Sequence, residues 1–100
     1  DALPIYADDH AGEMETSVMM HYHPELIDLR MAGSGEGKPF AIDSLNKKVA
    51  WIPRNWNKAS VDTGVGDPHK SSAGKGEKFA NVVTDKIALL FKELVKETIY

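Results

Sequence analysis

The stretch from Asp8 to Ser17, DDHAGEMETS, decides how the rest of the chain is interpreted. It places two aspartates, one histidine and two glutamates within eight positions, and it continues directly into an apolar segment with helical spacing. Carboxylates beside an imidazole at the start of a helix are the groups that metal-assisted and general acid–base chemistry uses. Because no other segment has this density of titratable groups, we expect the functional residues to lie here.

His10 and Glu15 are the two candidate site residues. They are five positions apart, about 140° around a regular helix, so they converge only if the first turn is irregular, which Gly12 permits. The imidazole would act as a general acid or base, and the glutamate would bind a cation or orient the imidazole. Alternatively, the acidic residues only stabilise the positive end of a helix dipole. Two or three ligands do not complete a zinc or manganese site, so further ligands would have to come from elsewhere.

Composition excludes several classes of protein. The 100 residues suit one small domain, and a 42% apolar content argues against disorder. A net charge of −3 gives no electrostatic reason to expect nucleic acid or an anionic membrane as a partner. The absence of cysteine excludes disulfides, thiolate zinc sites and cysteine nucleophiles, and it fits a reducing cytoplasmic compartment. No apolar run approaches the ~18 residues of a membrane span, and the first residues lack the features of a signal peptide.

The pattern predicts a first helix that begins near residues 10–11, with Asp8 or Asp9 as its N-cap. Pro24 limits this helix at the preceding residue. Glu15 is expected near the buried edge of the helix. The apolar stripe consists of Met14, Val18 and Tyr22.

A second, longer helix is predicted to follow a cap at Ser71 or Ser72 and to extend nearly to the C-terminus. It has the pattern of an amphipathic packing helix and not that of a membrane helix. Its apolar face comprises Phe79, Val83, Ile87, Leu90 and Leu94, widened by Val82, Phe91 and Val95.

The middle of the chain is less regular. Residues 48–53 are predicted to form a strand that ends at proline, and residues 30–39 form a loop with three closely spaced glycines. No GK[ST] sequence follows these glycines, so a surface loop is favoured over a phosphate-binding loop. Trp51 and Trp56 would either line a pocket or pack in a core. Because one strand cannot form a sheet, these pieces require a larger partner.

The other histidines and the serine at the end of the motif are weaker candidates. His21 and His23 form an H-x-H pair at a helix end, where capping or surface positions are favoured over metal binding. His69 lies in a polar turn. Ser17 lacks the G-x-S-x-G context of a nucleophilic serine.

Residues 10–17 resemble the H-A-G-E-x-E-T-S signature of the creatininase (creatinine amidohydrolase) family. The continuation through residues 23–26, HPEL, resembles the end of the family's motif helix. Residues 64–68, GVGDP, and the following segment 71–77, SSAGKGE, resemble the family segment that precedes the last helix. The resemblance therefore extends over nearly the whole chain.

The resemblance implies a three-layer α/β/α fold around a mostly parallel sheet, in proteins more than twice this length. The family's N-terminal half carries E-x-H-G-x-H-L-P and N-G-H-G-G-N segments, which supply most ligands of a two-metal site holding zinc, manganese or iron. Neither segment occurs in residues 1–100, which resemble the C-terminal half alone. The expected partner is therefore an N-terminal half or large subunit, and the family often forms hexamers.

Carried over residue by residue, the resemblance assigns His10 to the catalytic histidine at the scissile C–N bond. Glu15 corresponds to the acidic position at or beside the metals, and Glu13 is a weaker candidate for the same role. Trp51 and Trp56 do not align with the family's substrate tryptophans, so creatinine itself is not implied as the substrate. The implied activity is metal-dependent hydrolysis of a cyclic or linear amide, active only with the missing half. The alternative is a non-catalytic helical interaction module whose acidic stretch caps a helix.

Overall fold

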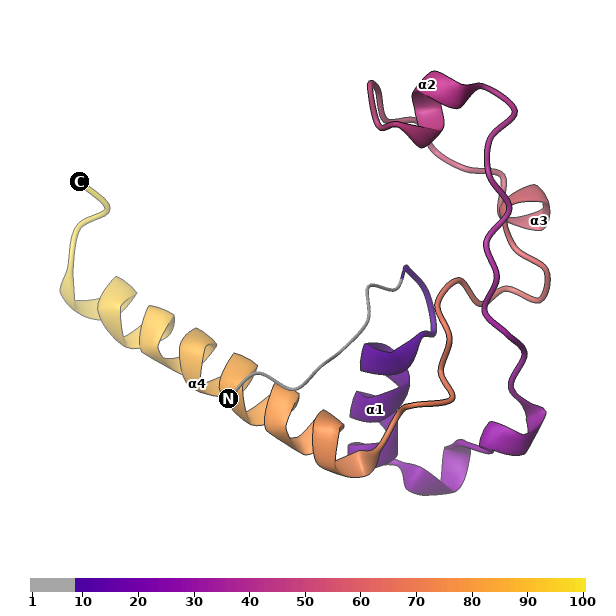
Figure 1. Cartoon of the computed structure of the whole chain (residues 1–100). Coiled ribbons are helices and arrows are strands. Elements are labelled where there is room, and N and C mark those ends of the chain that lie inside the picture. The colour runs from indigo at the N-terminus through magenta and orange to yellow at the C-terminus, as the bar shows by residue number, and fades with distance from the viewer. Residues whose placement is uncertain (1–8) are drawn as a thin grey trace.

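Residues 9–100 form an open, two-armed structure in a computed structural model, and the segment 1–8, including the predicted cap Asp8, lies outside the described residues. The long helix α4 (Ala73–Lys96) forms one arm, and α1 (Glu13–Tyr22) packs beside its beginning (Figure 1). Two 3₁₀ helices, η1 (Pro24–Leu26) and η2 (Leu29–Met31), lead into the second arm, which carries α2 (Asp43–Asn46) and α3 (Trp56–Ala59). The overall extents are 50 × 38 × 24 Å.

The junction between α1 and α4 is the best-packed part of the molecule. Glu13 and Ser17 are each only 1% exposed, and Gly76 and Ala80 of α4 are buried with them. A Cβ on Gly76 would lie 1.8 Å from the backbone oxygen of Ser17, so only glycine allows this approach of the two helices. Small and polar residues, not large apolar ones, therefore hold the two predicted helices together.

The predicted boundaries and packing face of α1 need correction. The helix begins at Glu13 and ends at Tyr22, and its N-cap is Gly12, which makes no side-chain capping bond. The side that packs on α4 presents Glu13, which pairs with Lys75, and Ser17, whose backbone lies against Gly76. Tyr22 of the predicted apolar stripe is 58% exposed, and Glu15 is exposed instead of lying at a buried edge.

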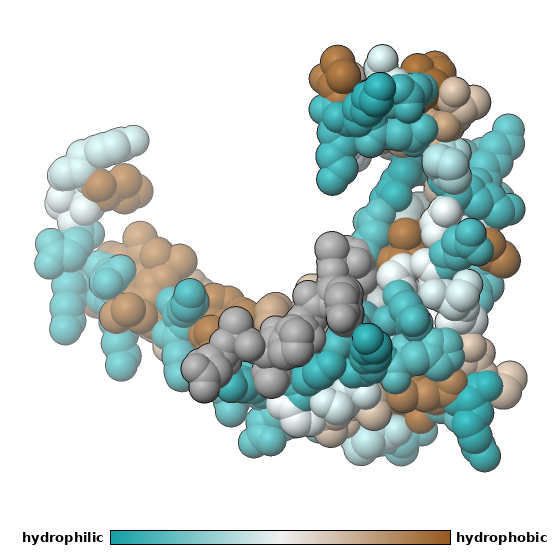
Figure 2. Space-filling view, in the orientation of Figure 1, coloured by the Kyte–Doolittle hydropathy of each residue, from teal (hydrophilic) through white to brown (hydrophobic). Residues whose placement is uncertain are grey.

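The prediction for α4 is confirmed at its start. The Ser72 side chain accepts a hydrogen bond from the Lys75 backbone N–H at 3.2 Å, which makes it the N-cap. The apolar face expected to pack is exposed beyond the junction, and Figure 2 shows hydrophobic surface along this arm. Within residues 9–100, no helix is long and apolar enough to cross a membrane.

The strand predicted for residues 48–53 is wrong. Lys48 adopts a left-handed conformation (φ 60°), and the following residues run as irregular chain without a pairing partner. Trp51 is 82% exposed, so it is not a core residue. The described residues contain no strand, only isolated antiparallel bridges between His10 and Val65 and between Gly37 and Ser60. The sheet of the expected fold therefore stays a prediction.

The glycine-rich loop confirms the surface-loop interpretation, and its glycines serve a close backbone crossing. Gly35 (φ 69°) accepts a hydrogen bond from the Gly66 N–H at 2.8 Å. A Cβ on Gly35 would lie 1.9 Å from the Gly66 oxygen. This crossing ties the loop after η2 to the GVGDP segment (residues 64–68).

Candidate active site around His10

The backbone of His10 is fixed by the GVGDP segment. The N–H groups of Asp9 and His10 both donate to the Val65 oxygen, at 2.8 and 2.9 Å, and the Val65 N–H donates back to the His10 oxygen at 2.9 Å. The two motifs that lie more than fifty residues apart in sequence therefore meet at this histidine. Its side chain remains 53% exposed.

The turn after His10 is left-handed at Ala11 (φ 53°), and the residues that follow stabilise it. The Ala11 N–H donates to Glu15 Oε2 at 2.6 Å, and the Thr16 hydroxyl donates to the Ala11 oxygen at 3.3 Å. These bonds offset a backbone cost of about 1–2 kcal/mol. Glu15 and Thr16 thus form hydrogen bonds to both backbone polar groups of Ala11, and these two bonds are called the clamp below.

This clamp brings the two predicted site residues together. Glu15 Oε2 lies 3.8 Å from His10 Nδ1, which is within ion-pair range but too long for a hydrogen bond. The irregular turn on which the sequence prediction depended is present, although the left-handed residue is Ala11 and not Gly12, which has a φ of −88°.

Glu13 and Ser17 belong to the helix junction and not to the surface around His10. The Glu13 carboxylate forms an ion pair with the Lys75 ammonium, which also donates to the Lys70 oxygen at 2.9 Å. Ser17 Oγ accepts the Ser72 N–H at 3.1 Å. In this structure the candidate metal ligand Glu13 is buried against α4, and Ser17 is too buried to act as a nucleophile.

Trp56 lies beside His10, a proximity that its position in the sequence did not indicate. The indole and imidazole centroids are 5.8 Å apart, with the ring planes 87° apart. The indole N–H donates to the Thr63 oxygen at 2.8 Å, and the Arg54 guanidinium lies 4.7 Å from the centre of the ring. Trp51 instead lines a separate cavity of about 820 Å³, whose wall includes Asp9 and Arg54. The two tryptophans therefore do not form one pocket.

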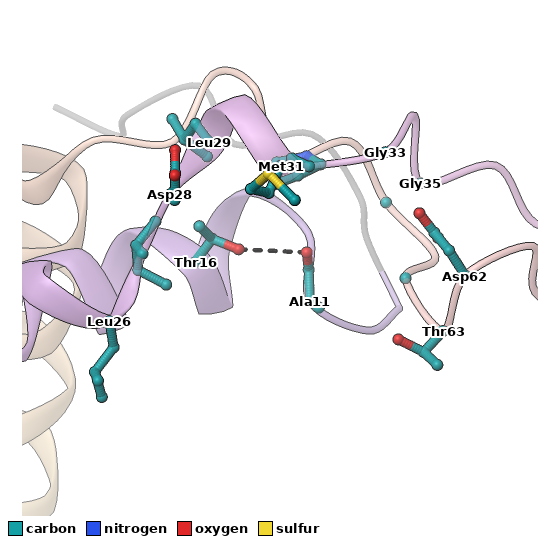
Figure 3. Close-up of a pocket in the computed structure, with 15 residues that line it drawn as sticks. Ala11, Thr16, Leu26, Asp28, Leu29, Met31, Gly33, Gly35, Asp62 and Thr63 are labelled. Carbon is teal, nitrogen blue, oxygen red and sulfur yellow. Dashed lines mark hydrogen bonds between the residues drawn. The ribbon is translucent and has the colours of Figure 1, made fainter.

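A second cavity, of about 260 Å³, lies against the turn that follows His10 (Figure 3). Its wall combines Ala11 and Thr16 with loop residues, including Gly33, Gly35 and Asp62. His10 lines neither this cavity nor the one beside Trp51. The His10 side chain is about half exposed, so it lies at the surface of the described part of the chain.

The residues described do not complete a metal site. Among residues 9–100, no three His, Asp or Glu side chains lie close enough together to hold a metal ion. His10 and Glu15 offer two donors at most, and one oxygen of Glu15 already accepts the Ala11 N–H.

The other histidines form local contacts. His23 Nδ1 lies 3.1 Å from Glu25 Oε1, and the His21 ring packs on that of Tyr22. His69 contacts Asp67, and the His69 backbone N–H is the main reason that the pKa of this carboxyl lies below its usual value.

Comparison with known proteins identifies the family. The creatininase family model, described as creatinine amidohydrolase, matches residues 3–91. A crystal structure of a predicted creatinine amidohydrolase from Bacteroides fragilis NCTC 9343 is similar, with 61% sequence identity and a TM-score of 0.87. The match covers 93% of this chain and 37% of that one. A search of curated proteins finds no match. The chain therefore belongs to the creatininase family.

Proposed function

We propose that this chain forms one wall of the active site of a metal-dependent amidohydrolase that hydrolyses a C–N bond in a cyclic or linear amide. The observation that carries the proposal is the placement of His10. Its half-exposed imidazole lies between the Glu15 carboxylate and the Trp56 ring, on a strained turn that Glu15 and Thr16 stabilise. Strained backbone of this kind is concentrated at functional sites.

In this proposal, water attacks the amide carbonyl carbon to form the new C–O bond, and His10 protonates the leaving nitrogen as the C–N bond breaks. The Glu15 carboxylate, 3.8 Å from Nδ1, lies beside the imidazole that performs this step. The Ala11 N–H holds Glu15 in place at 2.6 Å, so the carboxylate keeps its position while the histidine gains and loses its proton. Two carboxylate or imidazole donors are too few for zinc, manganese or iron, so any such ions would be held mainly by residues outside the described range.

The exposed face of α4 supports the second part of the proposal, that the site is completed by further polypeptide. Most large apolar side chains on this helix beyond its junction with α1 are roughly half exposed or more, which is costly for a finished domain. The similar B. fragilis chain is much longer, and this chain matches 37% of it. The remaining part would supply the parallel sheet of a three-layer α/β/α fold, and the complete protein would assemble into an oligomer such as a hexamer. The exposed apolar residues include Val82, Ile87, Leu90, Phe91 and Leu94.

The test compares the 100-residue chain alone with the complete protein that we propose, in which an N-terminal half or large subunit is also present; this complete protein is called the longer protein below. Each is incubated with zinc, manganese or iron, and metal retained after gel filtration is measured together with hydrolysis of a panel of cyclic and linear amides. The longer protein should retain metal and hydrolyse at least one amide, whereas the chain alone should do neither. Tight metal binding by the chain alone, or no hydrolysis by the metal-loaded longer protein, would contradict the proposal.

The alternative of a non-catalytic helical module draws support from the exposed α4 face and from the first turn of α1, which contains Glu13 and Glu15. Asp9, in contrast, pairs with Arg54, and the cap residue Gly12 has no side chain. The two functions differ in what Glu15→Gln does to the complete protein. Amide hydrolysis falls if the site is catalytic, whereas binding of the α4 face is unchanged in either case.

A further inference from the structure

A closed chain of contacts links His10 to Arg54, a residue that the family motifs do not include. The Arg54 guanidinium lies 2.5 Å from the carboxylate of Asp9, the residue before His10. The same guanidinium lies over the ring of Trp56, which in turn meets the ring of His10 edge to face. The contacts therefore run from Asp9 through Arg54 and Trp56 to His10, which is the residue next to Asp9 in the sequence.

This arrangement matters because, among residues 9–100, no hydrogen bond fixes the plane of the imidazole. Glu15 is too far from Nδ1 for a hydrogen bond, and its nearer oxygen is already held by the Ala11 N–H. The Trp56 ring is the aromatic group in contact with His10 in the described chain. The orientation of His10 thus depends on the position of Trp56.

Trp56 is held from two sides. Its indole N–H donates to the oxygen of Thr63, which adopts a left-handed conformation with a φ of 79°. Arg54 covers its ring, and Asp9 restrains Arg54. Two of the three non-glycine residues with positive φ in residues 9–100, Ala11 and Thr63, therefore lie one hydrogen bond away from the groups that contact His10.

We propose that Arg54 is a positioning residue for His10, acting through Trp56 and restrained by Asp9. Its planar guanidinium can stack on the indole while it pairs with the carboxylate, a combination that suits arginine better than lysine. Removal of the charge at position 54 releases the indole on one side, and the imidazole then samples several orientations. The proposal rests on the proposed function, because it assigns Arg54 a role in orienting the histidine that handles the proton.

The test follows the His10 ring protons by NMR in the 100-residue chain, with the resonances assigned from their loss in His10→Gln. The neighbouring indole displaces these resonances from the values of a free histidine. Arg54→Gln should remove more than half of that displacement, and Arg54→Lys should retain more of it than Arg54→Gln does. Lys58→Gln, which removes an exposed charge from α3, the short helix that carries Trp56, should leave the resonances unchanged.

Asp9→Asn provides a second variant, which keeps Arg54 but removes its ion pair with the Asp9 carboxylate. If Arg54→Gln does not fold, this variant tests the proposal. A partial loss of the displacement is expected. The proposal would be overturned if the His10 resonances kept their wild-type displacement in folded variants at Arg54 and Asp9. It would also be overturned if Lys58→Gln lost as much of this displacement as those variants do. The NMR displacement does not depend on hydrolysis, so its outcome is separate from that of the amide-hydrolysis test.

Discussion

The two ends of α4 are in very different surroundings. At its beginning, Gly76 and Ala80 are buried against α1, and Lys75 reaches the buried carboxylate of Glu13. Further along, Leu90 and Phe91 are 49% and 62% exposed. One continuous helix therefore joins a buried interface, called the finished interface below, to an exposed apolar face, called the unfinished face because the proposed function assigns it to further polypeptide.

The contrast separates the α1–α4 junction, which this chain packs by itself, from the exposed face of α4, which we propose that further polypeptide covers. The finished interface depends on a glycine, small residues and an ion pair, and it fixes the start of α1 just after His10. The unfinished face is broad and apolar, the surface that burial against a sheet would require. The site is thus attached to the part of the chain that is already packed.

The largest effect is expected from Lys75→Met, which removes the ion pair at the finished interface. Removal of the charged partner of a buried carboxylate lowers the free energy of unfolding by about 3–5 kcal/mol. Urea unfolding followed by circular dichroism would measure this loss. Adding Glu13→Gln to Lys75→Met should recover part of the stability, and a loss below about 1 kcal/mol in the single variant would contradict the contribution assigned to this pair.

Gly76→Ala should be the next most damaging change. Its Cβ would meet the Ser17 backbone oxygen at 1.8 Å, so α1 and α4 must separate, at a cost of about 1–3 kcal/mol. Gly74→Ala is the matched control, because nothing lies within 4 Å of the added carbon. Thermal unfolding should show destabilisation only at position 76, and equal melting temperatures for the two variants would contradict the packing account.

Leu90→Gln tests the unfinished face directly. In the 100-residue chain its effect on the free energy of unfolding should stay within about 0.5 kcal/mol, as for other exposed positions. In the longer protein the same change should cost about 2–4 kcal/mol, because the proposed function places this side chain against further polypeptide. Lys92→Gln on the same helix serves as control in both proteins. An equal effect of Leu90→Gln in chain and longer protein would mean that nothing covers this face.

The smallest effect concerns acid stability and the Asp67 carboxyl. Its folded-state pKa is lowered, mainly by the His69 N–H, so its contribution is present above the unfolded pKa of about 3.9. That contribution is lost as the pH falls through the folded pKa. Asp67→Asn should therefore reduce stability slightly at pH 7 and weaken the pH dependence below about pH 4, as measured by acid titration of the circular dichroism signal. An unchanged acid transition would contradict this assignment.

Local signals in the sequence predicted the helices but not their packing. The serine cap of α4 and the proline that follows α1 are encoded within a few residues, and both are found. The buried face of α1 depends instead on how closely Gly76 lets another helix approach, which no short window contains. The strand predicted at residues 48–53 failed because an apolar run becomes a strand only when another strand pairs with it.

The sequence predicted the part of the candidate site that lies within one short motif. The convergence of His10 and Glu15 required an irregular turn, and the structure has it at Ala11. Trp56 and Arg54 could not be assigned to the site because their proximity to His10 depends on the fold of residues 54–65, which brings them back to the motif.

The role of His10 as proton donor is tested most directly by the rate of amide hydrolysis by the longer, metal-loaded protein carrying His10→Gln. We expect kcat/KM to fall by about 100-fold or more, the usual effect of removing a general acid, while the protein keeps its metal. His23→Gln, which alters an exposed histidine beyond the end of α1, should leave kcat/KM within about twofold of the wild-type value. A His10→Gln protein that hydrolyses its amide substrate at the wild-type rate would contradict the central claim.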